Sequence, residues 1–305
     1  MKRYAFPLLY LFLCCGSPSG LQAKDKYFKE IVGGEDWYQS LQMSKVLFKK
    51  KTKFQKLIIF ENPTFGRILG LDGIVQLTQA DEPFYHEMIA HVPILAHGSV
   101  RSVLIIGGGD GGTAREVLRH KMVEKVVMVE IDGDVVEACK KYLPTVSNNA
   151  FNDPRLHLTI QDGLEFIKTT ADTFDLIICD STDPQGPGEV LFTPEFYKQC
   201  KKILRKGGIV VTQNGESFDE NVSCLKGFNN LRSQFTEAHL YLTCVPTYIG
   251  GHMTFGFATD TPEYFHVSSE ELQKRLEAID GQMQYYNPAV HIASFALPEY
   301  MRSRL

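Results

Sequence analysis

The sequence lacks the features by which several classes of protein are recognised. It has no excess of basic residues, because 32 lysines and arginines face 36 aspartates and glutamates and leave a formal net charge of −4. Sequence-independent binding to a phosphate backbone needs a basic surface, so that role is disfavoured. The chain also has no Walker loop and no Gly-x-Ser-x-Gly elbow, which argues against a P-loop nucleotidase and a serine hydrolase.

The cysteines are few and scattered. There are seven, an odd number, and no two form a Cys-x-x-Cys pair, so we expect neither a disulfide framework nor a structural metal site. His86 and His91 lie on one predicted helix but are separated by one residue more than the i, i+4 pair of zinc metalloproteases. We therefore predict no metal.

The composition is that of a globular protein. The 305 residues are 44% hydrophobic and 22% charged, which excludes wholesale disorder and a coiled-coil rod. Taking about 150 residues per domain as a guide, the length indicates one large domain or two unequal ones. The pattern of apolar runs along the sequence favours two unequal domains.

Residues 1–24 resemble a secretory signal peptide. Lys2 and Arg3 precede an apolar stretch over 5–15, followed by small and polar residues. The stretch is too short to span a bilayer, which needs about 20 residues. Leu21 occupies a position where signal cleavage favours a small residue, so we prefer an upstream extension of a cytoplasmic enzyme and leave export open.

Two patterns divide the rest of the chain. Residues 35–83 contain short apolar runs at 45–48, 56–60, 67–69 and 73–77, separated by turn signals, which predicts a small antiparallel β domain. Residues 84–305 begin with a helix and then alternate near-continuous apolar strands with helices. This alternation predicts an α/β domain whose mostly parallel sheet is covered on both faces.

A glycine-rich loop follows the first strand of this larger domain. Residues 107–112 read Gly-Gly-Gly-Asp-Gly-Gly, and Glu130 ends the next predicted strand. This spacing is typical of a Rossmann nucleoside site, in which the acidic residue binds ribose. Asp110 would repel a pyrophosphate by about 4 kcal/mol at roughly 4 Å, so the loop favours a cationic adenosyl sulfonium compound. Asp110 could also cap the following helix.

Further acidic residues follow the later strands. Asp162 and Gly163 are placed to contact adenine, although Asp162 fits a helix cap equally well. Asp180 and Asp183 follow the next strand and precede a loop rich in glycine and proline. Because an aliphatic amine has a pKa of about 10.4, a carboxylate here could hold the ammonium, orient its nitrogen and accept its proton.

These motifs, taken in order, resemble the polyamine aminopropyltransferases, and among them most closely the bacterial spermidine synthases. The resemblance covers about residue 35 to the end. It implies a small N-terminal antiparallel β domain and a Rossmann-like methyltransferase-type domain, assembled as a homodimer or homotetramer without metal. The motifs are Asp72-Gly73, Asp81-Glu82, Tyr85-His86-Glu87, GGGDGG at 107–112, DSTDPQGP at 180–187, PTYIG at 246–250 and YYNPA at 285–289.

The resemblance also implies an activity and a set of site residues. An aminopropyl group would pass from decarboxylated S-adenosylmethionine, a co-substrate, to putrescine, giving spermidine and methylthioadenosine. Asp180 would be the proton acceptor, and Asp110 would hold the aminopropyl amine. The remaining donor residues would be Gln55, Glu130, Asp162, Gly163 and Pro187. The acceptor groove would contain Tyr85, His86, Asp110, Asp180, Ser181, Thr182, Asp183 and Tyr248, with Gln213 a further candidate.

Three other functions are compatible with parts of this pattern. An S-adenosylmethionine-dependent N-methyltransferase is disfavoured because Asp110 would repel the carboxylate of that donor. A non-catalytic polyamine or nucleoside sensor would not need a base such as Asp180. A nicotinamide dehydrogenase is disfavoured by Asp110 as well. The sequence leaves putrescine, cadaverine and agmatine open as acceptors.

Overall fold

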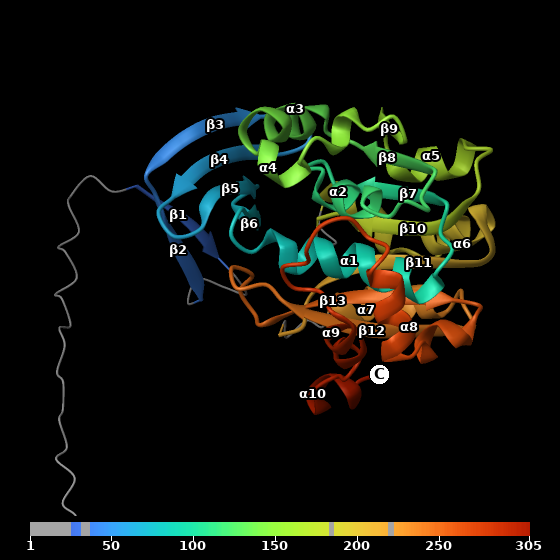
Figure 1. Ribbon diagram of the computed structural model, residues 1–305. Helices are drawn as coiled ribbons and strands as arrows, with labels where there is room; N and C mark the ends of the chain where they lie inside the picture. The colour runs from blue at the N-terminus through green and yellow to red at the C-terminus, as the bar shows by residue number, and fades with distance from the viewer. Residues whose placement is uncertain (1–25, 32–36, 183–185, 219–222) are drawn as a thin grey trace, which may run out of the picture.

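The computed structural model describes residues 26–31, 37–182, 186–218 and 223–305 (Figure 1). The signal-like segment over 1–24 lies outside the described residues. None of the helices in the described ranges is long and apolar enough to cross a bilayer.

Two small antiparallel sheets form the N-terminal part of the molecule. The first pairs β1 (Lys26–Ile31) with β2 (Tyr38–Met43), and β1 was not predicted from the sequence. The second is antiparallel, as the short apolar runs predicted, and has the order β3-β4-β5-β6. Turns at Asn62–Gly66 and at Asp72-Gly73, where Asp72 has φ of 50° and Gly73 of 92°, reverse the chain. The strands of this four-stranded sheet are β3 (Lys45–Lys51), β4 (Lys56–Asn62), β5 (Gly66–Leu71) and β6 (Ile74–Thr78).

The larger domain is built on a seven-stranded sheet of order β12-β13-β11-β10-β7-β8-β9. β9, β8, β7, β10 and β11 run parallel, and β13 pairs antiparallel with both β11 and β12. The α/β fold class with a mostly parallel sheet is confirmed. The strands are β7 (Ser102–Gly107), β8 (Lys125–Glu130), β9 (Leu156–Ile160), β10 (Phe174–Asp180), β11 (Leu204–Glu216), β12 (Glu237–Cys244) and β13 (His252–Thr259).

Helices cover both faces of this sheet (Figure 1). Alternate residues of β7 divide between two cores: Val103 and Ile105 pack with α1 and α2, and Leu104 and Ile106 pack with α5, α6 and α7. Such alternation buries each strand on both sides, which is why the strands read as continuous apolar runs. The longer α-helices are α1 (Glu82–His97), α2 (Gly112–Leu118), α3 (Gly133–Tyr142), α5 (Gly163–Thr169), α6 (Pro194–Ile203), α7 (Ser223–Arg232), α8 (Ser269–Leu276) and α9 (Pro288–Ser294). The short α-helices are α4 (Pro144–Ser147) and α10 (Glu299–Arg302), and the 3-10 helices are η1 (Ala150–Asn152), η2 (Gly186–Phe192) and η3 (Pro262–His266).

The four-stranded sheet is joined to the larger domain through α3. Apolar residues of β4 and β5, including Leu57 and Leu69, pack against Val135 and Cys139 of that helix in a separate core. Thr52 adds a polar link, because its hydroxyl donates to Asp132 at 2.7 Å. This packing places one edge of the small sheet beside the carboxyl ends of the parallel strands.

Candidate active site

A cavity of about 410 Å³ lies where the small sheets meet the carboxyl ends of β7, β8 and β10. Ligands of open α/β sheets bind at this edge, because the strand order reverses there and the loops diverge. The loops after the three strands all contribute side chains or backbone to the wall. The sequence-predicted residues that line the cavity are Gln55, Tyr85, His86, Asp110, Glu130, Asp162, Gly163, Asp180, Ser181, Thr182, Gln213 and Tyr248.

Glycines allow the first loop to pass close to β10. Gly107 and Gly108 have φ of 84° and 70°, in the left-handed region where a side chain is strained. A Cβ on Gly107 would also lie 2.1 Å from the carbonyl oxygen of Asp180. The same carbonyl accepts a hydrogen bond from the Gly108 amide at 2.8 Å. The loop and the end of β10 therefore share a backbone contact at the floor of the cavity.

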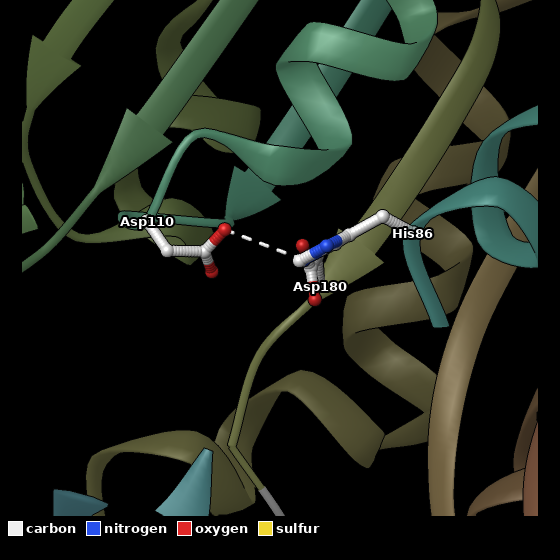
Figure 2. A group of neighbouring side chains, drawn as sticks. All are labelled: His86, Asp110 and Asp180. Atoms are coloured by element: carbon white, nitrogen blue, oxygen red, sulfur yellow. Dashed lines mark ion pairs between the residues drawn. The ribbon is translucent and has the colours of Figure 1, made fainter. Parts of the chain in front are cut away.

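Asp110, His86 and Asp180 form a cluster in the cavity (Figure 2). They come from the loop after β7, from α1 and from the end of β10. The ligand atoms of the three side chains all lie within 4.8 Å of one another, and His86 Nε2 is 3.3 Å from Asp110 Oδ1. Asp180 accepts hydrogen bonds from the Tyr85 hydroxyl at 2.7 Å and the Thr113 hydroxyl at 2.6 Å. These two donors fix its orientation.

The three groups alter one another's protonation. Burial alone would lower the pKa of His86, but Asp110 and Glu82 outweigh it and raise that pKa to about 10. Burial opposes ionisation of Asp110 as well, yet His86 keeps the pKa of Asp110 below its usual value. The pKa of Asp180 is raised by burial and by the charge of Asp110, and His86 offsets part of the rise. Asp180 is therefore a stronger proton acceptor than an ordinary aspartate.

This cluster suits an organic cation better than a metal ion. An imidazolium has no lone pair to give to a metal, and a pKa of about 10 keeps His86 in that form at neutral pH. The Asp180 oxygens already accept hydrogen bonds from Tyr85 and Thr113. Asp110 Oδ1 accepts from the Gly112 amide at 2.7 Å, which leaves its second oxygen for an ammonium group.

Polar residues that could bind a nucleoside also line the cavity. Glu130 is buried at the end of β8, and burial raises its pKa to about 7 while the Asp132 amide, donating at 2.8 Å, opposes the rise. Gln55 lines the same end of the cavity and is held by Asp132, to which its side-chain amide donates at 3.0 Å. Asp162 caps α5 by accepting from the amides of Leu164 and Glu165, so the capping alternative is correct although Asp162 also lines the cavity.

Residues predicted for the acceptor also line the cavity. Ser181 and Thr182 continue from Asp180, and the side-chain amide of Gln213 donates to the Ser181 carbonyl at 2.8 Å. The Tyr248 hydroxyl donates to the Gln76 carbonyl, which ties the 246–250 motif to β6. Asp183 and the side chain of Pro187 lie outside the described residues.

Three polar residues of the site, two in the cavity wall and one hydrogen-bonded to Asp180, were not predicted from the sequence. Glu30 on β1 is buried and accepts a hydrogen bond from Gln39 at 2.6 Å. Glu216 ends β11, three residues beyond the predicted Gln213, so its position after a strand was the available signal. No sequence signal could have identified Glu30, because it reaches the cavity only through the pairing of β1 with β2. Thr113, on Asp180, was missed since a hydroxyl in a helix is common.

Comparisons with known proteins identify the family to which the chain is similar. The profile of the spermine/spermidine synthase domain matches residues 82–268, and that of the spermidine synthase tetramerisation domain matches residues 27–79. A polyamine aminopropyltransferase of Escherichia fergusonii is 49% identical over 279 residues, covering 89% of this chain and 97% of that protein. One of Salmonella schwarzengrund is 51% identical over 267 residues, covering 88% and 93%.

Solved structures show the same arrangement of the chain. A spermidine synthase crystallised with the transition-state analogue AdoDATO has a TM-score of 0.87 and 37% identity, covering 92% of this chain and 94% of that one. Spermidine synthase from Thermotoga maritima has a TM-score of 0.84 and 35% identity, with the same coverage. The chain therefore belongs to the spermine/spermidine synthase family.

Proposed function

We propose that this protein transfers the aminopropyl group of decarboxylated S-adenosylmethionine to putrescine, giving spermidine and methylthioadenosine. The observation that carries the proposal is the pair of carboxylates Asp110 and Asp180, held within 4.8 Å of each other in one cavity beside a nucleoside-type loop. The names of the relatives support it, because they are polyamine aminopropyltransferases and spermidine synthases. Both substrates are cations, and the cavity presents carboxylates to both.

The reaction is a nucleophilic displacement at carbon. The free electron pair of the acceptor nitrogen attacks the aminopropyl methylene next to the sulfonium, the carbon–sulfur bond breaks, and its electron pair neutralises the sulfur. The new carbon–nitrogen bond leaves one excess proton on nitrogen, which Asp180 accepts. Since the sulfonium is a good leaving group, holding the two reactants in line supplies much of the rate.

Each lining residue is assigned a role by its position. Asp110 binds the donor's terminal ammonium, and Glu130 binds the ribose hydroxyls. On the acceptor side, Tyr85 orients Asp180 by its hydrogen bond. Gln55, Asp162, Gly163 and Pro187 are assigned to the rest of the nucleoside, and His86, Ser181, Thr182, Asp183 and Tyr248 to the acceptor groove.

One experiment separates this function from its rivals. The purified protein is incubated with decarboxylated S-adenosylmethionine and a panel of putrescine, cadaverine and agmatine, and product masses are read. We expect spermidine and methylthioadenosine with putrescine. A methylated diamine formed from S-adenosylmethionine would instead indicate an N-methyltransferase, and binding without any product would indicate a sensor.

The raised pKa of Glu130 predicts a pH-dependent nucleoside affinity. A ribose diol donates to the ionised carboxylate, so binding must displace a proton below about pH 7. We expect methylthioadenosine to bind about five- to tenfold more weakly at about pH 6 than at about pH 8. Calorimetric titration measures this, and Glu130→Gln should weaken binding and remove the pH dependence. A wild-type affinity that is constant across this range would contradict the assignment.

We also propose that the protein is a homo-oligomer that associates through its N-terminal sheet; whether the assembly is a dimer or a tetramer is left to measurement. A matched tetramerisation domain over 27–79 supports association. Ile31 and Tyr38, paired across β1 and β2, are 57% and 48% exposed, and Trp37 stacks edge-on against Phe218, which is 65% exposed. An apolar surface of this kind is typical of an interface.

A charge placed in this surface should dissociate the assembly. Ile31→Glu would bury a carboxylate in the interface, and we expect light scattering after size exclusion to show a lower mass than for wild type. Ile292→Glu is the matched control, because Ile292 is 49% exposed on α9 and lies outside this surface. Equal masses for wild type and both variants would contradict the proposed interface.

The proposed compartment is the cytoplasm. Cys139, Cys179, Cys200 and Cys244 are free thiols, which fits a reducing environment. Sequencing the N-terminus of the protein isolated from its native host tests this proposal, since removal of residues 1–24 would indicate export.

A further inference from the structure

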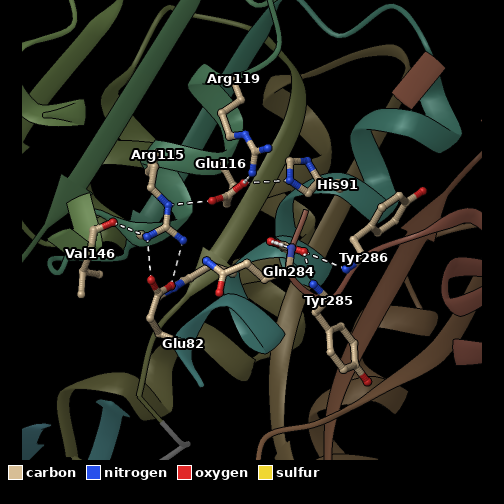
Figure 3. Close-up of polar contacts among 12 residues, drawn as sticks. Glu82, His91, Arg115, Glu116, Arg119, Val146, Gln284, Tyr285 and Tyr286 are labelled. Carbon is tan, nitrogen blue, oxygen red and sulfur yellow. Dashed lines mark hydrogen bonds and ion pairs between the residues drawn. The ribbon is translucent and has the colours of Figure 1, made fainter. Parts of the chain in front are cut away.

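A buried chain of charged groups crosses from α1 to α2 behind the active site (Figure 3). Arg115 lies at its centre. It donates to both oxygens of Glu82, at 2.7 and 2.8 Å, and to Glu116 at 2.6 Å. Both carboxylates are almost fully buried, with side chains 7% and 3% exposed. None of these three residues lines the cavity.

Each carboxylate also holds one histidine. Glu82 Oε2 is 2.6 Å from Nδ1 of His86, and Glu116 Oε2 is 2.8 Å from Nε2 of His91. The two histidines differ in what their second nitrogen meets. His86 faces Asp110 in the active site, whereas His91 faces His120 in the protein interior. This buried chain of charged groups contains two similar carboxylate–histidine pairs, and only the pair Glu82–His86 reaches the cavity.

We infer that Glu82 is a positioning residue that holds His86 as a fixed cation beside Asp110 and Asp180, and that this cation disfavours the ammonium form of the bound acceptor so that its nitrogen attacks as a free amine. The inference rests on the proposed function and extends it. His86 contacts the site, and Glu82 acts only through His86.

The reason lies in a conflict within the cavity. Carboxylates attract the diamine, but they also stabilise its ammonium form, which has no electron pair for attack. A fixed positive charge nearby has the opposite effect. Each unit by which it lowers the pKa of the bound amine increases the reactive fraction about tenfold near neutral pH.

The charged and titratable groups around His86 come from four elements. Glu82 and Tyr85 lie on α1, and Arg115 on α2 reaches the cluster through Glu82. Asp110 follows β7 and Asp180 ends β10. A Cβ on Gly112 would lie 2.3 Å from the His86 ring, so the start of α2 confines the imidazole as well. Glu82 and Asp110 thus hold the two ring nitrogens from opposite sides.

The first test reads the charge of His86 in the resting protein. Ring-nitrogen NMR shifts of protein labelled with 15N-histidine are followed against pH, with His86→Gln used to assign the signal. We expect the wild-type midpoint to lie far above the usual value of about 6.5, and Glu82→Gln to lower it by about one to three units. Glu116→Gln is the matched control, because it removes the other carboxylate from Arg115, and it should leave the midpoint unchanged.

Two results of this titration would overturn the inference. One is a wild-type midpoint near that of free histidine, which needs no variant and so remains decisive if Glu82→Gln fails to fold. The other is an equal shift in Glu82→Gln and Glu116→Gln, which would mean that general disturbance of Arg115 explains the change.

The second test separates kcat from KM. With decarboxylated S-adenosylmethionine saturating, and at a pH between the His86 midpoints measured for Glu82→Gln and for wild type, Glu82→Gln should lower kcat about tenfold. It should not raise the KM for putrescine, because the lost cation repelled the diamine. A raised KM with unchanged kcat would overturn the inference. Wild-type protein that forms no aminopropyl product would refute the proposed function instead, and the NMR titration of His86 would stand independently.

Discussion

Asp180→Asn is expected to lower kcat by about 10³-fold or more, while methylthioadenosine and the decarboxylated donor still bind. Asparagine keeps an oxygen that can accept from Tyr85, so the local structure should survive. It cannot accept the proton released when the new carbon–nitrogen bond forms, and loss of general-base catalysis costs about 10² to 10⁴ in rate. Steady-state kinetics and calorimetric titration measure the two effects.

Thr113→Val is the control for this substitution. It removes the second hydrogen bond to Asp180, at 2.6 Å, and leaves the carboxylate in place. We expect kcat to fall by about 10- to 100-fold, less than in Asp180→Asn, since a hydrogen bond to a charged group contributes about 1.5–3 kcal/mol. Comparable losses in the two variants, or full activity in Asp180→Asn, would mean that Asp180 is not the base.

Asp110→Asn is expected to weaken binding of the decarboxylated donor about 10- to 100-fold and to change methylthioadenosine affinity little. Only the donor carries the terminal ammonium that the Asp110 carboxylate would hold, and a hydrogen bond to a charged group contributes about 1.5–3 kcal/mol. The amide keeps an oxygen for the Gly112 amide and is nearly the same size as the carboxylate. Parallel titrations of the two ligands give the comparison.

The informative quantity is how much more Asp110→Asn weakens binding of the decarboxylated donor than binding of methylthioadenosine. Asp110→Asn also disturbs His86, which lies 3.3 Å away, and such a disturbance would affect both ligands alike. Glu130→Gln provides the reverse pattern, because ribose is common to both and both should weaken together. Equal losses for the two ligands in Asp110→Asn would contradict its assignment to the aminopropyl amine.

Much of the larger domain could be predicted because local and global requirements agree. β7, β8 and β10 are buried on both faces, so each appears in the sequence as an unbroken apolar run. Asp132 and Asp162 cap α3 and α5 by accepting from backbone amides, and the helices begin at Gly133 and Gly163, where the sequence predicts them. The apolar run over 208–212 predicts a short strand, but β11 extends over Leu204–Glu216. Leu204 pairs with β10 at the start of the strand, and polar residues continue the pairing with β13 at its end.

The parts of the cavity that depend on distant pairing could not be predicted. Glu30 is brought in by β1, whose sequence Lys-Tyr-Phe-Lys-Glu-Ile alternates only weakly in polarity. The Glu82–Arg115–His86 contacts also join residues from two helices that nothing in the sequence places together. In contrast, Asp110 and Asp180 could be placed near each other, since both follow strands of one parallel sheet.

The backbone contact between Gly108 and Asp180 has a consequence for inhibition. Because β7 and β10 are neighbours and this contact ties their ends at 2.8 Å, the spacing between the two substrate positions is built into the sheet. A single compound that fills both positions would therefore bind to a site whose two halves already have their final spacing. Stiffening the tether between its two halves should then increase its affinity, because the compound loses less conformational freedom when it binds to a site of fixed spacing.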